Sequence, residues 1–350
     1  MKNKIFLYPT FLFLFLFLLD KIFLIKKIQF LTQKDATFIY YQYKTELLEK
    51  LKYTYQRQDK KILILIGSSR LMFVDYSEFK KLYPDWEMFN FSVPVNSPSY
   101  YLFILEKIFK NQIQPDLILL ETDPYQFNEF SPGFRKSNLP YTFDLSFVIR
   151  YFNLFEREEV SEFLGYSLFA GKRYPPDIPT LIERLRNPNE KILQIFYKTE
   201  LFQRENNGCG LPPIPLKEWY IRNLAEIELS AKGTIEWLYR NYKYSERQWI
   251  FFEKTINLLR EKQAKFILVK PQVSPIMEEM LLKNPKIQYA YLIWNKKIKE
   301  IIQPNEFIDF SHSQSFFCNT FVDGSHMSLE CYDPLLFQVL FLYENSMQNR

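Results

Sequence analysis

The chain has 350 residues, of which 24% are charged and 47% hydrophobic, and its formal net charge is +5. These ordinary globular values argue against a disordered chain, a collagen and a protein that crosses the membrane many times. The chain has only 2 histidines, which excludes metal sites built from several histidines. It has only 8 glycines, which argues against phosphate-binding loops built from several glycines. No compact basic patch predicts nucleic-acid binding.

The amino-terminal segment from Ile5 to Ile25 is almost entirely apolar. As a helix it would be about 30 Å long, the thickness of the hydrocarbon core of a bilayer. It predicts a single uncleaved membrane anchor within residues 1–27, with a cleaved signal peptide and a buried soluble helix as alternatives. Asp20 and Lys21 lie near its end, where charges cost less than at the bilayer centre. The flanking lysines leave the orientation undecided.

Residues 28–60 predict a juxtamembrane helix that leads into the body. Five short apolar runs then predict strands buried on both faces, as in a parallel sheet: Lys61–Gly67, Trp86–Phe91, Asp116–Leu120, Lys265–Val269 and Glu306–Phe310. Helical patterns alternate with them over Ser99–Lys110, Ser245–Gln263, Tyr289–Ile302 and Cys331–Glu344. This alternation predicts an α/β fold with a doubly wound, mostly parallel sheet.

Residues 125–244 interrupt the alternation with prolines and short helical fragments but no comparable strand. We expect a long helical insertion over the carboxyl ends of the strands, where open α/β sheets bind ligands. A separate small domain is the alternative. The sheet domain would then be divided between residues 61–124 and 245–350.

The loop after the first strand, with Ser69 in the run Gly-Ser-Ser-Arg, is the first candidate site. A serine at this edge of the sheet, before a predicted helix, exposes its hydroxyl beside backbone N–H groups that stabilise negative charge. In a purely structural role the same run would be a helix cap.

The turn after the last strand, with Asp323 and His326, is the second candidate site. An aspartate three residues before a histidine can accept the Nδ1–H of the ring and leave Nε2 to take a proton from a serine. A turn that merely precedes a histidine is the alternative for this motif alone. Both loops follow carboxyl ends of parallel strands, so we expect Ser69 and His326 to meet. His312 is predicted to be a loop residue.

In the order and spacing of these motifs the chain resembles the SGNH (GDSL-type) hydrolase superfamily. It looks most like the membrane-anchored branch with the D-alanyl transfer protein DltD and alginate O-acetylation proteins, whose relatives carry G-S-S-R and end in D-x-x-H. The resemblance covers about residues 60–125 and 260–345. It implies a three-layer, flavodoxin-like sandwich with Ser69 as nucleophile, His326 as general base and Asp323 as its orienting partner. We expect no cofactor and no metal.

The chain departs from that superfamily where a glycine after the second strand and an asparagine after the third help to form the oxyanion hole. Val95 occupies the position of that glycine. Its N–H can still donate a hydrogen bond, and Asn96 is the next residue. Asp123 falls at the asparagine; an ionised carboxylate donates no hydrogen bond and repels an oxyanion, so it must be protonated, displaced or used otherwise. Arg70 is expected to hold the loop or to pair with a substrate anion. Glu121 and Asp123 could contribute to a cation site, but the sequence indicates no third ligand, so we do not predict one.

The 3 cysteines fit no metal-binding spacing. In an oxidising compartment, Cys318 and Cys331 would pair and staple the carboxy-terminal loop, leaving Cys209 free. Three unpaired thiols are an equal alternative.

Together these observations predict a serine esterase or O-acyltransferase, anchored once in the cell membrane with its body outside the cytoplasm. Its substrates would be acyl groups of a cell-envelope glycan or lipid, and a membrane-bound acyltransferase is a candidate partner. The alternative from another class is a catalytically inactive envelope protein of the same fold that binds a glycan or a partner in an assembly complex. An esterase tethered to the cytoplasmic leaflet is a third option.

Overall fold

The computed structural model describes all residues except 1, 58, 214, 216, 312–315 and 349–350, so His312 lies outside the described residues. Five strands form one parallel sheet: β1 (Lys61–Ile66), β2 (Trp86–Asn90), β3 (Leu117–Glu121), β4 (Phe266–Lys270) and β5 (Phe307–Asp309). The predicted α/β fold with a parallel sheet is therefore confirmed, and each predicted strand is found to within one residue at either end.

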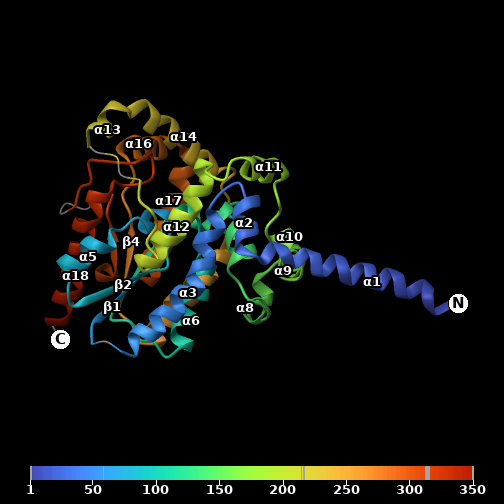
Figure 1. The fold of residues 1–350 in the computed structure, drawn as a ribbon. Coiled ribbons are helices and arrows are strands. Elements are labelled where there is room, and N and C mark those ends of the chain that lie inside the picture. Colours follow the sequence, from blue (N-terminus) through green and yellow to red (C-terminus); the bar gives the residue numbers. More distant parts are fainter. Residues whose placement is uncertain (1, 58, 214, 216, 312–315, 349–350) are drawn as a thin grey trace.

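The strands lie in the order β2-β1-β3-β4-β5, one of the two common orders of doubly wound α/β proteins (Figure 1). Chain order reverses between β1 and β3, and open α/β sheets bind ligands in the crevice beyond the carboxyl ends of such strands. The loop that carries Ser69 follows β1, and Asp123 follows β3. The topology therefore brings two of the predicted site segments to this crevice.

Helices cover both faces of the sheet because successive side chains of each strand point to opposite sides. Ile62 and Ile64 belong to one core, with α3 (Thr37–Tyr55), α6 (Pro98–Lys110), α15 (Glu246–Glu261) and α17 (Pro285–Ile301). Leu63 and Leu65 belong to the other core, with α5 (Tyr76–Leu82) and α18 (Tyr332–Gln348). The sheet is thus the middle layer of three.

The amino terminus differs from the predicted single span. The first helix, α1 (Lys2–Asp20), ends inside the predicted anchor and is followed by η1 (Lys21–Leu24) and α2 (Lys26–Thr32). The Asp20 carboxylate accepts hydrogen bonds from the N–H groups of Ala170 and Gly171 at 2.6 and 2.7 Å, which ties the end of α1 to the body. Among the helices that the structure describes, none combines the length and apolarity needed to cross a bilayer.

The predicted juxtamembrane helix is also divided. α2 and α3 replace the single helix expected over residues 28–60. Leu47 and Leu51 of α3 are fully buried in the same core as β1. Most of this segment therefore belongs to the helical layer of the sheet domain.

The insertion enters and leaves the sheet domain at one place. The N–H of Ser245 donates to the carbonyl of Phe127, and that of Glu129 to the carbonyl of Lys243, both at 2.8 Å. Between these points lie α7 (Leu139–Tyr141), α8 (Leu145–Arg150), α9 (Arg157–Leu168), α10 (Ala170–Arg173), α11 (Ile178–Arg186), α12 (Lys191–Glu205), α13 (Lys217–Arg222) and α14 (Leu224–Tyr239).

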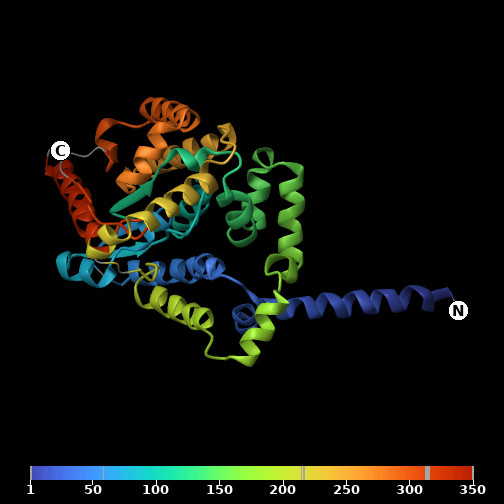
Figure 2. The ribbon, with the colours of Figure 1, turned by 90° about the horizontal axis from the view of Figure 1, so that it is seen from above.

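Only the last part of the insertion covers the strand ends as expected. α14 reaches the loop after β3, where the hydroxyl of Tyr239 donates to Asp123 at 2.9 Å. In contrast, α12 packs along α3, α8 packs on α6 and α15, and α9 to α11 gather beside α1 and α2 (Figure 2). Aromatic side chains such as Phe38, Tyr174 and Phe196 form a separate small core there.

The connection from β5 to α18 carries the second predicted motif back across the sheet. It is held at the end of β4, where Gln272 exchanges two hydrogen bonds with the backbone of Cys318, and near β1, where the Tyr332 hydroxyl donates to the Arg70 carbonyl at 2.9 Å. Cys318 and Cys331 form a disulfide across it, as one of the two alternatives predicted, and Cys209 is free and buried.

Candidate active site

Ser69 stands at the carboxyl edge of the sheet as the first residue of the short helix α4 (Ser69–Met72). Its neighbour Ser68 is buried and binds the carboxyl group of Glu121 at the end of β3, through its N–H at 2.5 Å and its Oγ at 2.7 Å. These bonds join the ends of β1 and β3 and fix the loop. Because α4 has only 4 residues, it lacks the substantial dipole of a longer helix.

His326 and Asp323 meet Ser69 as predicted. The Ser69 Oγ lies 2.7 Å from Nε2 of His326, and Nδ1 of the same ring lies 2.8 and 2.9 Å from the two carboxylate oxygens of Asp323. The serine and histidine are separated by 257 positions in the chain, so the fold of the sheet domain brings them together. The three side chains have the connectivity of a serine–histidine–aspartate triad.

The turn itself sets the charge state of Asp323. Burial alone raises the pKa of this carboxyl group, but His326 and the N–H groups of Ser325 and His326 outweigh burial and lower the pKa to about 2. An ionised carboxylate can only accept hydrogen bonds, so Nδ1 of His326 carries a hydrogen. In the neutral ring, Nε2 is then the acceptor for the Ser69 hydroxyl.

Arg70 and Asp123 form a buried ion pair behind this triad. Arg70 Nη1 lies 2.7 Å from Asp123 Oδ2, and their side chains are 4% and 1% exposed. Asp123 Oδ1 accepts from the Tyr239 hydroxyl and the Tyr125 N–H. Because both carboxylate oxygens are occupied and both side chains are buried, Arg70 holds the loop, which is the first of its two predicted roles, and Asp123 serves another purpose than the oxyanion hole.

The expected oxyanion donors are only partly in place. The Ser69 N–H faces the Pro94 carbonyl at 3.4 Å, and Val95 is buried beside it. Asn96 offers a free donor: its Oδ1 accepts from Tyr101 and Gln126, whereas its buried Nδ2 has no partner within the described chain. Asn96 follows Pro94 by two residues, so the Cα atoms of these two residues are at most about 7 Å apart.

Three side chains of the site, two beside His326 and one beside Asp123, were not predicted from the sequence. The Ser325 Oγ lies 3.1 Å from Nδ1 of His326, and the Phe73 ring packs edge-on against the imidazole with the centroids 5.5 Å apart. Tyr239 reaches Asp123 from the far end of the insertion. Ser325 lies inside the D-x-x-H motif but was not expected to contact the ring, and only the fold brings Phe73 and Tyr239 to the site.

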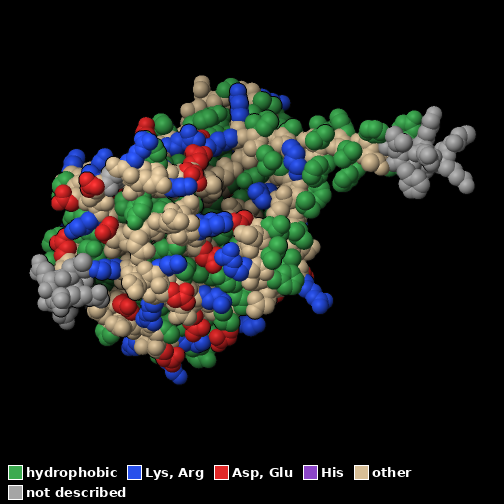
Figure 3. All heavy atoms as spheres, turned by 90° about the horizontal axis from the view of Figure 1, so that it is seen from below, with side chains coloured by type: hydrophobic (Ala, Val, Ile, Leu, Met, Phe, Trp, Pro, Cys, Tyr) green, Lys and Arg blue, Asp and Glu red, His purple; other side chains and the backbone are tan. Residues whose placement is uncertain are grey.

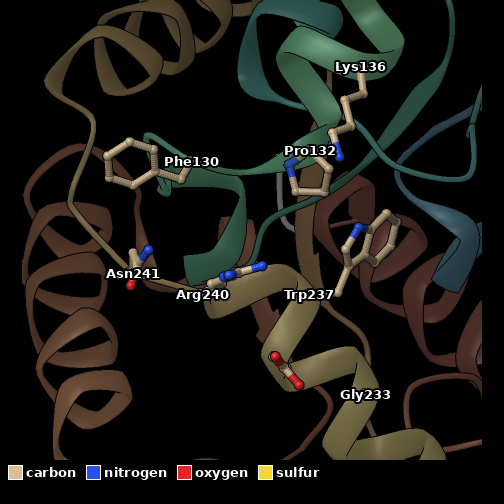
Figure 4. Close-up of a pocket in the computed structure, with 8 residues that line it drawn as sticks. Phe130, Pro132, Lys136, Gly233, Trp237, Arg240 and Asn241 are labelled. Carbon is tan, nitrogen blue, oxygen red and sulfur yellow. The ribbon is translucent and has the colours of Figure 1, made fainter.

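A cavity of about 340 Å³ lies between the two ends of the insertion (Figure 4). In this view Arg240 extends between Phe130 and Trp237. None of Ser69, Asp323 and His326 lines this cavity, but segments next to its walls contact Asn96 and Gly324. A side chain at Gly133 would come within 2.6 Å of the Asn96 carbonyl oxygen, and one at Gly324 within 2.5 Å of the Ala231 Cα.

No group of three or more His, Cys, Asp or Glu side chains in the described residues is arranged to hold a metal ion. The fold and the site define an α/β protein with a serine–histidine–aspartate triad at the carboxyl edge of a parallel sheet.

The chain belongs to the family described as "Protein of unknown function (DUF1574)", whose sequence model matches residues 1–343. A comparison with the curated proteins finds no significant match. The family match spans both loops of the triad, so nearly the whole architecture described above falls within the family.

Proposed function

We propose that the protein is a serine esterase or O-acyltransferase of the SGNH type. The observation that carries this proposal is the continuous chain of contacts from Ser69 Oγ through His326 to Asp323. A serine hydroxyl becomes an effective nucleophile when an adjacent base accepts its proton and a third group orients that base.

The reaction would proceed in two balanced steps. The Ser69 Oγ attacks the acyl carbonyl while its proton moves to Nε2 of His326, and the leaving alcohol departs with that proton to give an acyl-serine. Water or a sugar hydroxyl then attacks the acyl-serine, giving its own proton to Nε2, which returns it to Ser69. Asp323 stabilises the imidazolium that forms in each step. Asn96 is fully buried, so its Nδ2 becomes a donor to the oxyanion only if the side chain turns toward the acyl carbonyl.

The likeness to membrane-anchored SGNH proteins supports acyl groups of a cell-envelope glycan or lipid as substrates, with residues 5–25 attaching the protein to the cell membrane. The disulfide between Cys318 and Cys331 favours a body outside the cytoplasm, because such bonds persist in oxidising compartments. The cavity in Figure 4 presents the aromatic rings of Phe130 and Trp237 with the charged Lys136, Glu236 and Arg240. This combination suits a sugar better than an acyl chain. Because no triad residue lines the cavity, it supports a glycan-binding surface and not the pocket for the acyl group.

A fluorophosphonate probe tests the proposal directly, since it reacts with activated serines. We expect the wild-type protein to be labelled and Ser69→Ala to be unlabelled. Ser77→Ala is the matched control, because Ser77 is exposed on α5 and should leave labelling unchanged. Labelling that persists in Ser69→Ala would remove Ser69 from the proposed role.

The second candidate is an inactive envelope protein of this fold that binds a glycan or a partner in an assembly complex. The engagement of the Ser69 N–H by Pro94 and the use of Asp123 as an ion-pair partner favour it, because both reduce the oxyanion donors. Losing one such donor typically raises the barrier by about 2.7–4 kcal/mol. A folded wild-type protein that the probe does not label would favour this alternative.

A further inference from the structure

Two helices of the insertion expose apolar side chains around the point where α1 leaves the body. On α9 and just after it these are Leu164, Leu168 and Phe169, and on α11 they are Ile178, Ile182 and Leu185. Their exposure ranges from 39% to 63%. We call these six residues the apolar rim. Contiguous exposed apolar side chains mark surfaces that contact a protein or a membrane.

Each of these helices buries one charged side chain, although α9 also buries Phe163 and both helices expose other charges. Glu159 of α9 has a fully buried side chain that pairs with Arg247 at 2.5 Å and Arg135 at 3.3 Å. Arg184 of α11 is 2% exposed and donates to the carbonyls of Phe30 and Gln33 at 2.7 and 2.6 Å. A surface helix in water normally buries apolar residues and exposes charges. Here each helix directs a charge inward and the rim outward.

The occupant is indicated by α1, which contacts the rim at Phe169. Almost every side chain from Phe11 to Leu19 is exposed, although all of them are apolar, and a helix that is apolar on all sides requires apolar surroundings. The Phe17 ring of α1 packs edge-on against the Phe169 ring of the rim, with the centroids 6.1 Å apart. The same surroundings therefore cover the exposed face of α1 and the rim next to it.

The arrangement of the helices fits a flat lipid surface. In Figure 2, α1 projects from one end of the body, and the helices of residues 157–186 lie at its base on both sides of it. Figure 3 shows hydrophobic side chains gathered around that base. Exposed Lys172 and Arg186 stand beside the rim, where basic side chains attract anionic headgroups.

We propose that the apolar rim is a second membrane-contact surface, embedded at the boundary between headgroups and acyl chains of the bilayer to which α1 is attached. The rim holds the body against the membrane through α9 and α11 instead of leaving it on a free tether. This extends the membrane attachment proposed above and does not depend on the chemistry of Ser69.

Environment-sensitive labels on the full chain test this proposal. Cys209 is buried and the other two cysteines are paired, so one introduced cysteine is the accessible thiol. Leu164→Cys and Ile182→Cys place a nitrobenzoxadiazole label on the rim, and Phe15→Cys places it on α1. Phe337→Cys is the matched control: it is 60% exposed on α18, at the end of the body away from α1 (Figure 1).

The labelled proteins are reconstituted in vesicles of phosphatidylcholine and phosphatidylglycerol. We expect emission from Leu164→Cys and Ile182→Cys to shift to the blue and to be quenched by nitroxide-bearing lipids, with no change for Phe337→Cys. Quenching at Phe15→Cys alone would overturn the proposal and leave the attachment by α1. No quenching at any position would overturn both. Protection of the rim labels at high protein concentration without lipid would also overturn it, in favour of a second copy of the chain.

Discussion

Ser68 and Ser69 are neighbours in the chain, but their hydroxyl groups lie in different surroundings. Ser68 points into the protein and binds buried Glu121, whereas Ser69 is half-exposed and contacts His326. The same contrast separates buried Arg70 and Asp123 from the accessible triad. The inner side chains therefore position the loop, whereas the outer ones are accessible to solvent. We call Ser68, Arg70, Glu121 and Asp123 the inner group, and Ser69, Asp323 and His326 the outer group.

The largest expected effect is on the outer group. His326→Ala should lower the rate of fluorophosphonate labelling by about 10⁴-fold or more, because it removes the base that accepts the serine proton. The rate constant is measured over a series of probe concentrations. Ser325→Ala is the matched control and should cost less than about tenfold, since it leaves the bonds between His326 and Asp323 intact. Equal rates for His326→Ala and wild type would contradict the triad.

The largest effect on the inner group is on stability. Arg70→Met should lower the free energy of unfolding in urea by about 3–5 kcal/mol, because it leaves the Asp123 carboxylate buried without its partner. The double variant Arg70→Met/Asp123→Leu should recover much of that loss, since no charge then remains unpaired. A loss below about 1 kcal/mol for Arg70→Met would match a surface ion pair and contradict the buried role.

Asn96 tests the boundary between the two groups, because its Oδ1 faces the core and its Nδ2 is unpartnered. Asn96→Ala should lower kcat/KM for hydrolysis of a p-nitrophenyl ester by about 10²–10³-fold if Nδ2 stabilises the oxyanion. Tyr101→Phe removes the hydrogen bond to the Oδ1 and the one that Tyr101 accepts from Gln126, but it leaves Nδ2 unchanged. It should therefore change stability with little change in kcat/KM. Similar kcat/KM values for Asn96→Ala and Tyr101→Phe would assign Asn96 to the core.

The smallest expected effect is the contribution of Asp323 to the free energy of unfolding at acid pH. The pKa of Asp323 is about 2 in the folded protein and 3.8 for an ordinary aspartate, so the unfolded chain binds its proton first as the pH falls. The stabilisation from Asp323 is therefore complete above about pH 4 and is lost as the pH falls towards 2. The effect is small because the side chain is 34% exposed. Urea unfolding of Asp323→Asn should lack this pH dependence; an identical dependence in both proteins would refute the assignment.

The sequence alone determined the strands and the two loops of the candidate site, because both depend on local patterns. Runs such as Lys61–Ile66 are apolar throughout, which only a strand covered on both faces accommodates. Asp323 and His326 are three residues apart, so their contact needs only a turn. The meeting of Ser69 with His326 followed from one further rule, that carboxyl ends of parallel strands share an edge.

Only the tertiary structure decided what Arg70, Asp123 and the insertion do. Arg70 and Asp123 are 53 positions apart, and Tyr239 joins them from 116 positions beyond Asp123, so no local pattern marks their burial. The faces that α9 and α11 turn outward were equally hidden, since an amphipathic pattern reports that a helix has two faces but not which one meets the body. Burial and long-range pairing depend on the packing of distant segments, and that packing is a property of the whole fold.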